Sequence, residues 1–214
     1  MTAPATIDAA GPGHLDACVR VLADAFGVGP LAEWLVPDDV RRPAVYRGYW
    51  RIDAEHALRP GSTAVVDVAR ADGGAVVGAA FWYPVAGGGT PDLTGQAYDR
   101  MLAAVVGDDD LLDRWQRLDL LIDRALPKLA EDWAYLGFLA VAPTHQRRGV
   151  GTALLAARHR DLDRSGTPAF LIASSPDSAR LYARHGYRRH ADPVELPEAT
   201  TMYPMLRPPG PPPG

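Results

Sequence analysis

The sequence of 214 residues is poor in cysteine, and Cys18 is its only thiol. A single thiol cannot form an internal disulfide or a cysteine-rich metal site, and it fits a reducing compartment, so we predict a cytoplasmic protein. No stretch reaches the roughly 18–20 apolar residues of a membrane-spanning helix, which argues against a membrane partner. The opening MTAPATIDAA has neither the basic nor the apolar region of a signal peptide.

Lysine is scarce as well. The formal net charge is −4 and Lys128 is the only lysine, so bulk electrostatics do not suggest a nucleic-acid partner. Arginine carries the rest of the positive charge, and an isolated arginine is therefore weak evidence for a site. We predict no metal site, because no ligand spacing relates the histidines we considered, which are His14, His145, His159 and His185.

Apolar periodicity divides the chain into helices and strands. Two β-branched runs around Asp72-Gly73-Gly74 predict an antiparallel hairpin over residues 62–84. The expected helices are 14–26, a short apolar segment at 31–36, 41–58, 96–106, 111–125 (with Asp110 as N-cap), 149–163 and 176–185. A flexible loop is expected at 85–95, and further strands at 133–141, 168–173, 187–195 and 201–206.

This order predicts a mixed α/β fold. Antiparallel strands come first and a crossover unit comes later, so we expect a mixed sheet with helices on both faces. The length fits one domain, which we place at residues 1–207, with a helical insertion at 96–126. The Pro/Gly-rich tail at 208–214 is expected to be disordered or polyproline-like.

One short segment, QRRGVG at residues 146–151, lies between a predicted strand and a predicted helix. A helix N-terminus carries free N–H groups and partial positive charge, and glycine lets a ligand approach the backbone closely. The segment is neither a P-loop nor a Rossmann fingerprint, because no Gly-Lys-Ser/Thr follows and Leu154 occupies the third glycine position. It therefore indicates a diphosphate ligand or, alternatively, an ordinary strand–helix turn.

The stretch LAVAPTHQRRGVGTALL resembles the acetyl-CoA-binding motif of the GCN5-related N-acetyltransferases (GNAT), whose pattern is Gln/Arg-x-x-Gly-x-Gly/Ala. The likeness continues through PAFLIASSPDSARLYARHGYRR, where the family has a strand, a polar loop and a tyrosine-bearing helix. Within the superfamily the sequence looks nearest to puromycin N-acetyltransferase-like bacterial enzymes. The resemblance implies the GNAT fold, a twisted, mostly antiparallel mixed sheet of six to seven strands flanked by helices.

The resemblance also implies acetyl-CoA as the cofactor. Its pantetheine arm would pair with the strand edge at Leu139, Ala140 and Val141, and its pyrophosphate would meet the amides of residues 147–152. In the family, this strand splays from the next strand and so admits the cofactor. The implied cofactor-binding residues are Leu139, Ala140, Val141, Gln146, Arg147, Arg148, Gly149, Val150, Gly151, Thr152, Ser175, Ser178 and Tyr182.

The tyrosine of the second motif is the predicted general acid. Ser175 and Pro176 read as N-cap and first helical residue, and Gly186 suits the position past the helix end. Ser178 and Tyr182 share one helix face. By resemblance, Tyr182 donates a proton to the departing thiolate. Ser178 replaces the usual asparagine. Ile172-Ala173 replaces the Glu-Thr pair of the puromycin enzyme, which argues against a simple transfer of that specificity.

A protonated alkylamine cannot attack a thioester, so a base must remove a proton. The candidates are Glu33, Tyr135, Glu131 and Asp132, or a water chain with no single base. For acceptor contact we favour Trp82 and Tyr83 among the aromatic residues Trp34, Trp50, Trp82, Tyr83 and Trp115. The loop at 85–95 and the helices at 96–125 are a candidate lid.

We therefore predict an acetyl-CoA-dependent N-acetyltransferase that acts on a primary amine of a small molecule, antibiotic-like or metabolite, by direct attack in a ternary complex. A protein N-terminus or lysine is an alternative acceptor. A non-catalytic acyl-CoA-binding sensor and a scaffold are alternatives from other classes, and a homodimer stays open.

Overall fold

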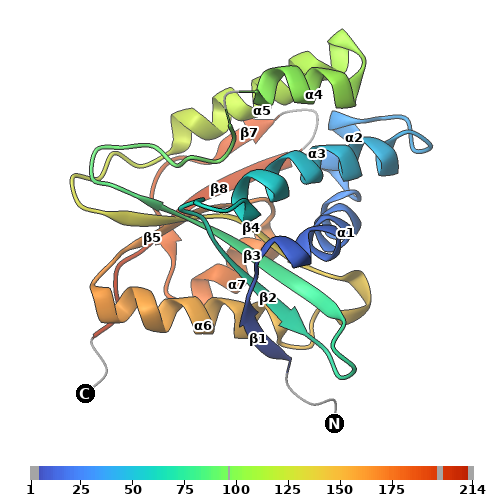
Figure 1. The fold of residues 1–214 in the computed structure, drawn as a ribbon. Coiled ribbons are helices and arrows are strands. Elements are labelled where there is room, and N and C mark those ends of the chain that lie inside the picture. The colour runs from blue at the N-terminus through green and yellow to red at the C-terminus, as the bar shows by residue number, and fades with distance from the viewer. Residues whose placement is uncertain (1–4, 96, 197–199, 212–214) are drawn as a thin grey trace.

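The computed structural model describes residues 5–95, 97–196 and 200–211. A twisted sheet forms the centre, with helices on both sides (Figure 1). The helices are α1 (Leu15–Phe26), α2 (Pro30–Leu35), α3 (Arg42–Leu58), α4 (Tyr98–Val106), α5 (Asp109–Ala125), α6 (Val150–Ser165) and α7 (Pro176–Arg184). The strands are β1 (Thr6–Ala9), β2 (Val65–Arg70), β3 (Val76–Val85), β4 (Trp133–Val141), β5 (Ala169–Ala173), β6 (Arg188–Arg189), β7 (Val194–Leu196) and β8 (Thr200–Arg207).

The strands are ordered β1-β2-β3-β4-β5-β8-β6, and β7 also pairs with β8. Among the described strands only β4 and β5 run parallel, because α6 carries the chain across between them. All the other pairs are antiparallel. The predicted fold class is confirmed.

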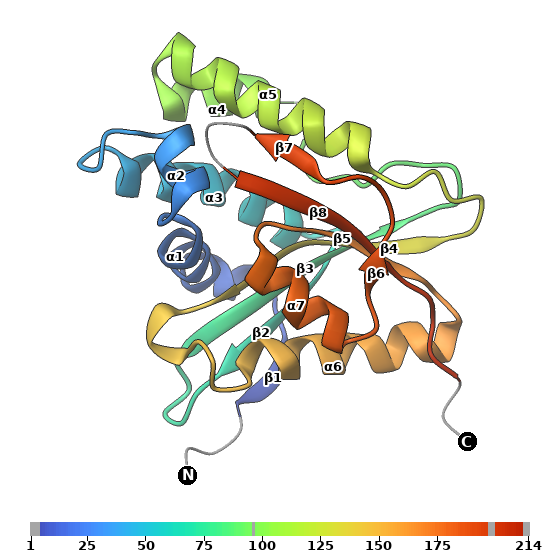
Figure 2. The same ribbon diagram turned by 180° about the vertical axis from the view of Figure 1, so that it is seen from behind.

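Each face of the sheet has its own core. On one face α1 and α3 cover the sheet, and on the other α6 and α7 cover it (Figures 1 and 2). Neighbouring residues of β3 serve opposite cores, since Phe81 belongs to the first and Trp82 to the second. A buried ion pair ties α6 to the sheet: Arg158 Nη2 lies 2.7 Å from Asp67 Oδ1.

The predicted elements are present, with four corrections. The hairpin turns at residues 71–75 as expected. Helix α5 begins two residues earlier than predicted, because its N-cap is Asp108 and not Asp110; the Asp108 carboxylate accepts a bond from Leu111 N at 3.1 Å. The strand predicted at 187–195 is two short strands, β6 and β7. Strand β1 was missed, and the sheet therefore has eight strands where six to seven were expected.

Helices α4 and α5 lie within the segment expected to be an insertion. They are integrated in the first core, where Leu102 and Val106 are fully buried and Trp115 is 2% exposed. Opening these helices as a lid would expose that surface to water, at a large cost in free energy. Residue 96, where the first of these helices was expected to start, lies outside the described residues.

Candidate active site

The free edge of β4 is the first part of the candidate site. Strand β4 pairs with β5 only from Ala134 to Leu136, although β4 continues to Val141. Its register with β3 shifts where Phe81 faces Phe138 and Trp82 faces Leu136, which leaves Gly137 in a bulge. Residues 137–141 therefore have β3 on one side and, among the described residues, no strand on the other. Their peptide groups on that side can pair with an extended ligand.

The glycine turn before α6 is the second part. Arg147 and Gly149 have left-handed backbone conformations, with φ of 59° and 85°. The first bond of the helix runs from Ala153 N to Gly149 O at 2.9 Å. Within the described backbone, no N–H group from Arg147 to Thr152 donates to a carbonyl oxygen. Free amides at a helix N-terminus in a left-handed turn form an anion-binding concavity.

Strand edge, turn and α7 meet at Gly151. A Cβ atom there would lie 3.6 Å from Leu139 Cδ2 and 3.8 Å from both Val141 Cγ2 and Leu181 Cδ2. Gln146 supports the turn, because its Nε2 donates to Val141 O at 3.1 Å. A ligand that follows the β4 edge therefore arrives at the free amides of α6.

These residues fit the phosphates and the pantetheine of acetyl-CoA. The amides at the start of α6 are available for the pyrophosphate. Arg147 and Arg148 are exposed beside them, and in the part of the chain that the structure describes neither makes an ion pair. The predicted cofactor-binding residues of the strand and the turn are thus brought together in space, although they come from different elements.

Helix α7 carries Tyr182 beside this edge. Tyr182 is 8% exposed and packs edge-on against Tyr187 with ring centroids 5.8 Å apart. Burial raises the pKa of Tyr182, so the phenol is protonated at neutral pH, as a proton donor must be. Tyr182 is close enough to Tyr135 on β4 to raise the pKa of that residue.

The predicted N-cap of α7 is observed. Ser175 Oγ accepts from Ser178 N at 3.1 Å, and Ser178 Oγ accepts from Ser175 N at 3.0 Å, which is a capping box. Ser178 Oγ also donates to Ser175 O at 2.9 Å. The hydroxyl expected to contact the cofactor is therefore already engaged in capping the helix. Gly186 has the positive φ of 89° expected just past the helix.

The base candidates lie apart from one another. Glu33 is exposed on α2. Asp132 and Glu131 precede β4, at the end opposite its free edge, and Asp132 Oδ1 accepts from Gly87 N at 2.9 Å. Tyr135 is 4% exposed, and burial raises its pKa, so its hydroxyl cannot accept a proton at neutral pH.

The aromatic residues favoured for acceptor contact are buried. Trp82 and Tyr83 are each 1% exposed, and they lie on opposite faces of the sheet. Trp82 packs beneath α6, with its ring 6.0 Å from that of His159, so its prediction as an acceptor contact is wrong: the alternation of β3 turns it into the core. Trp34, Trp50 and Trp115 are buried as well.

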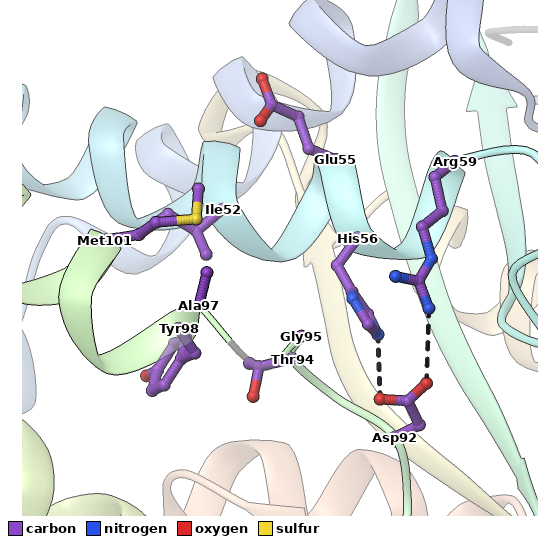
Figure 3. Close-up of a pocket in the computed structure, with 10 residues that line it drawn as sticks. All are labelled: Ile52, Glu55, His56, Arg59, Asp92, Thr94, Gly95, Ala97, Tyr98 and Met101. Atoms are coloured by element: carbon purple, nitrogen blue, oxygen red, sulfur yellow. Dashed lines mark hydrogen bonds and ion pairs between the residues drawn. The ribbon is translucent and has the colours of Figure 1, made fainter.

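A cavity opens between α3 and residues 92–101, on the face opposite α6. It measures about 710 Å³ and is lined by residues that include Ile52, Glu55, His56, Asp92 and Tyr98. Figure 3 shows His56 and Arg59 reaching Asp92 from α3. His56 Nε2 lies 3.1 Å and Arg59 Nη2 3.6 Å from the Asp92 carboxylate. These contacts hold the loop at 86–95 against the helix.

Sequence analysis missed one buried carboxylate. Asp53 on α3 is 1% exposed. Burial raises the pKa of Asp53, and a hydrogen bond from the Tyr49 side chain opposes this shift. A signal was present in the sequence, because Asp53 lies four residues after Tyr49 and three after Trp50, on the apolar face of a helix.

Part of the sequence is similar to known acetyltransferases. Residues 126–206 match the acetyltransferase (GNAT) domain. N-acetyltransferase Eis of Mycobacterium tuberculosis is 44% identical over 54 residues, which are 25% of this chain and 13% of that protein. The chain thus matches only a small part of that relative's length.

Two solved structures share the fold over nearly the whole chain. One is a histone acetyltransferase HPA2 and related acetyltransferase from Corynebacterium glutamicum, with a TM-score of 0.73, 24% identity and coverage of 98% and 99% of the two chains. The other is the PaiA N-acetyltransferase of Thermoplasma acidophilum in complex with coenzyme A, with a TM-score of 0.54, 11% identity and coverage of 96% and 99%.

The match to the GNAT acetyltransferase domain thus covers residues 126–206, and nearly the whole chain shares the fold of the two solved structures. The free strand edge and the amides of α6 are arranged as acetyl-CoA would require. No helix in the described part of the chain is long and apolar enough to cross a membrane.

Proposed function

We propose that the protein transfers an acetyl group from acetyl-CoA to the primary amine of a small molecule by direct attack in a ternary complex. The observation that carries the proposal is the meeting of the β4 edge, the amides of α6 and the helix of Tyr182 around Gly151. Bound acetyl-CoA supplies the acetyl group as a thioester. Antibiotic-like amines, including those of the puromycin enzyme's class, belong to the range of acceptors to be tested.

Peptide groups of the chain would bind and orient acetyl-CoA, and side chains would transfer the protons. The peptide groups of residues 137–141 orient the acyl arm, and the amides of residues 147–152 bind the pyrophosphate. As the nitrogen–carbon bond forms and the carbon–sulfur bond breaks, the ammonium loses two protons. Glu33 or a water chain accepts one, and Tyr182 passes the other to the thiolate. Tyr135 is left out as a base because it stays protonated.

A small acceptor is favoured over a protein chain by the size of the cavity beside α3, since a volume of about 710 Å³ suits a compact ligand. Asp92 of the loop at 86–95 lines this cavity and contacts His56 and Arg59 of α3. We propose that residues 1–207 form one domain and that the protein acts in the cytoplasm. Sedimentation measurements test whether it forms a homodimer.

Replacing Tyr182 with phenylalanine tests the proposed acid. We expect kcat to fall about 100-fold or more while the KM for acetyl-CoA stays within twofold, because only the proton donor is lost. The measurement is thiol release with an amine acceptor found by screening. Tyr187→Phe is the matched control, since Tyr187 is also buried but hydrogen-bonds His159. Unchanged turnover in Tyr182→Phe refutes the assigned role, and wild-type protein that binds acetyl-CoA without acetylating any amine favours a sensor.

A further inference from the structure

The cavity beside α3 contains a histidine that is paired with a carboxylate. His56 lies in the last turn of α3 and is 8% exposed. Its Nε2 lies 3.1 Å from Asp92 Oδ1, and Arg59 Nη2 lies 3.6 Å from Asp92 Oδ2 (Figure 3). The carboxylate of the loop is therefore held from two sides, and it fixes the orientation of the imidazole ring.

The second ring nitrogen of His56 faces Gly95. A Cβ atom on Gly95 would lie 3.3 Å from His56 Nδ1, so the glycine leaves open the space in front of this nitrogen. Both residues line the cavity. Because Nε2 is directed at a carboxylate, which can only accept, the proton of the neutral ring lies on Nε2 and Nδ1 carries the free electron pair. Nδ1 is thus a base that a ligand in the cavity can reach.

The loop that carries Asp92 also contacts the bulge of β4. Leu93 follows Asp92, and a Cβ atom on Gly137 would lie 3.6 Å from Leu93 Cδ2. Residues 92 and 95, which both contact His56, are three positions apart, so their Cα atoms are separated by at most about 11 Å. The imidazole and the start of the free β4 edge therefore lie against the same short segment of the loop.

Helix α3 is itself fixed against this part of β4. Trp50, six residues before His56, packs edge-on against Phe138, with ring centroids 4.9 Å apart. Phe138 lies beside the bulge, just beyond the last residue of β4 that pairs with β5. Six residues of a helix span about 9 Å. His56 thus projects from a rigid element that packs on the strand edge where the thioester would lie.

We propose that His56 is the general base that removes a proton from the ammonium group of the acceptor, and that Asp92 is the positioning residue that orients its ring. The inference rests on the proposed function. It puts His56 in the place of Glu33, which does not line the cavity.

The proton transfers balance with His56 in this role. One N–H bond of the ammonium breaks, its proton bonds to His56 Nδ1, and the nitrogen keeps the electron pair that forms the bond to the thioester carbon. As the carbon–sulfur bond breaks, the second proton reaches the thiolate through Tyr182. His56 then returns its proton to the solvent, and the net products are the amide, the free thiol of coenzyme A and one proton.

His56→Gln tests the base, because glutamine can keep a hydrogen bond to Asp92 but cannot take up a proton. A panel of primary alkylamines is first screened for acetylation by the wild-type protein. With the best acceptor, we expect kcat/KM for the amine at pH 7 to fall about 100-fold or more, and the KM for acetyl-CoA to stay within twofold. His190→Gln, at an exposed position, is the control and should behave as wild type.

The pH dependence separates the loss of a base from a loss of structure. An alkylamine has a pKa near 10, so its unprotonated fraction rises about tenfold per pH unit between pH 7 and pH 9. The kcat/KM of His56→Gln should follow that fraction, whereas wild type should change little because its own base accepts the proton. The other titratable groups that line the cavity are Glu55, Arg59, Asp92 and Tyr98, and the variant retains all of them.

Two further variants test the geometry. Gly95→Ala keeps the His56–Asp92 pair but places a methyl group in front of Nδ1, and φ of Gly95 lies outside the left-handed region, so the backbone accepts alanine. We expect kcat/KM for the amine to fall at least tenfold, which keeps the test open if the glutamine variant does not fold. Gly13→Ala, where a Cβ atom meets nothing within 4 Å, is the control. Asp92→Asn should lose activity at pH 7 and recover part of it at pH 9.

Equal kcat/KM values in wild type, His56→Gln and Gly95→Ala overturn the inference and leave the proposed function standing. A loss in His56→Gln that is the same at pH 7 and pH 9 also overturns it, because the histidine then only supports the structure. If the wild-type protein acetylates no amine of the panel, the proposed function fails and the inference falls with it.

Discussion

At the residue scale, burial decides which titratable groups the fold keeps neutral. His159 on α6 is 6% exposed, and its Nε2 lies 3.1 Å from the Tyr187 hydroxyl. Burial lowers the pKa of His159 to about 3, with further lowering by Arg207 and His185, while Asp163 opposes the shift. The imidazole is therefore uncharged in the folded protein throughout the physiological range.

The lowered pKa of His159 predicts acid sensitivity. At a pH below about 6.5, the ordinary pKa of histidine, the imidazole of His159 is protonated in the unfolded chain but not in the folded protein. The free energy of unfolding therefore falls as pH falls. From pH 6.5 to pH 5 this loss amounts to about 2 kcal/mol, at about 1.4 kcal/mol per pH unit.

His159→Gln should remove that loss. Urea unfolding at pH 7.5 and at pH 5 measures it, as a difference between the two pH values that is about 2 kcal/mol smaller in the variant than in wild type. His190→Gln, at an exposed position, serves as control and should behave as wild type. An identical pH dependence in His159→Gln would show that the histidine is charged or solvated in the folded state.

At the element scale, both ends of α6 depend on a glycine in the left-handed region. Gly149 and Gly166 have φ of 85° and 69°, and a Cβ at either position would meet no atom within 4 Å. Alanine at each therefore costs about the same backbone strain, on the order of 1–2 kcal/mol. Only the turn at Gly149 aims free amides at the proposed pyrophosphate site.

Gly149→Ala and Gly166→Ala form a matched pair. We expect both variants to lose similar thermal stability, and we expect only Gly149→Ala to bind coenzyme A at least tenfold more weakly. Differential scanning fluorimetry and calorimetric titration with coenzyme A measure the two effects. Equal coenzyme A affinity in both variants would show that the glycine turn does not contribute to cofactor binding.

At this scale the long periodic elements could be predicted and the short ones could not. The helix of Tyr182 and the strand 133–141 have clear periodicity and boundary residues, so the sequence located them within a residue or two. Strand β1 has four residues and no alternation, and it is held by its pairing with β2. The N-cap of α5 was misplaced because three successive aspartates, Asp108 to Asp110, are equally good caps in sequence.

At the scale of the whole molecule, one sheet joins the two cores. Residues of β3 and β4 contribute alternately to the cluster beneath α3 and to the cluster beneath α6. Neither core can lose its packing without exposing the other face of the same strands. The α4–α5 segment shares the first core through Trp115, so we expect it to unfold with the rest.

This arrangement predicts a single unfolding transition that shifts as a unit when acetyl-CoA binds. Tryptophan fluorescence and far-ultraviolet circular dichroism should give coincident curves. Acetyl-CoA at about 100 times its Kd should raise the unfolding free energy by about 2.7 kcal/mol, which is a rise of several degrees in Tm. Two separate transitions would contradict the shared-sheet account, and an unchanged Tm would favour the scaffold alternative.

The sequence by itself determined the glycine turn at residues 146–151, the tyrosine helix and the mixed fold class, because each depends on local chemistry and on the periodicity of neighbouring residues. Only the tertiary structure decided that Trp82 is buried beneath α6 and that Asp53 is buried on α3. Both properties depend on which distant segments pack against each other. Burial sets the pKa of a side chain and its access to a ligand, and burial comes from that packing.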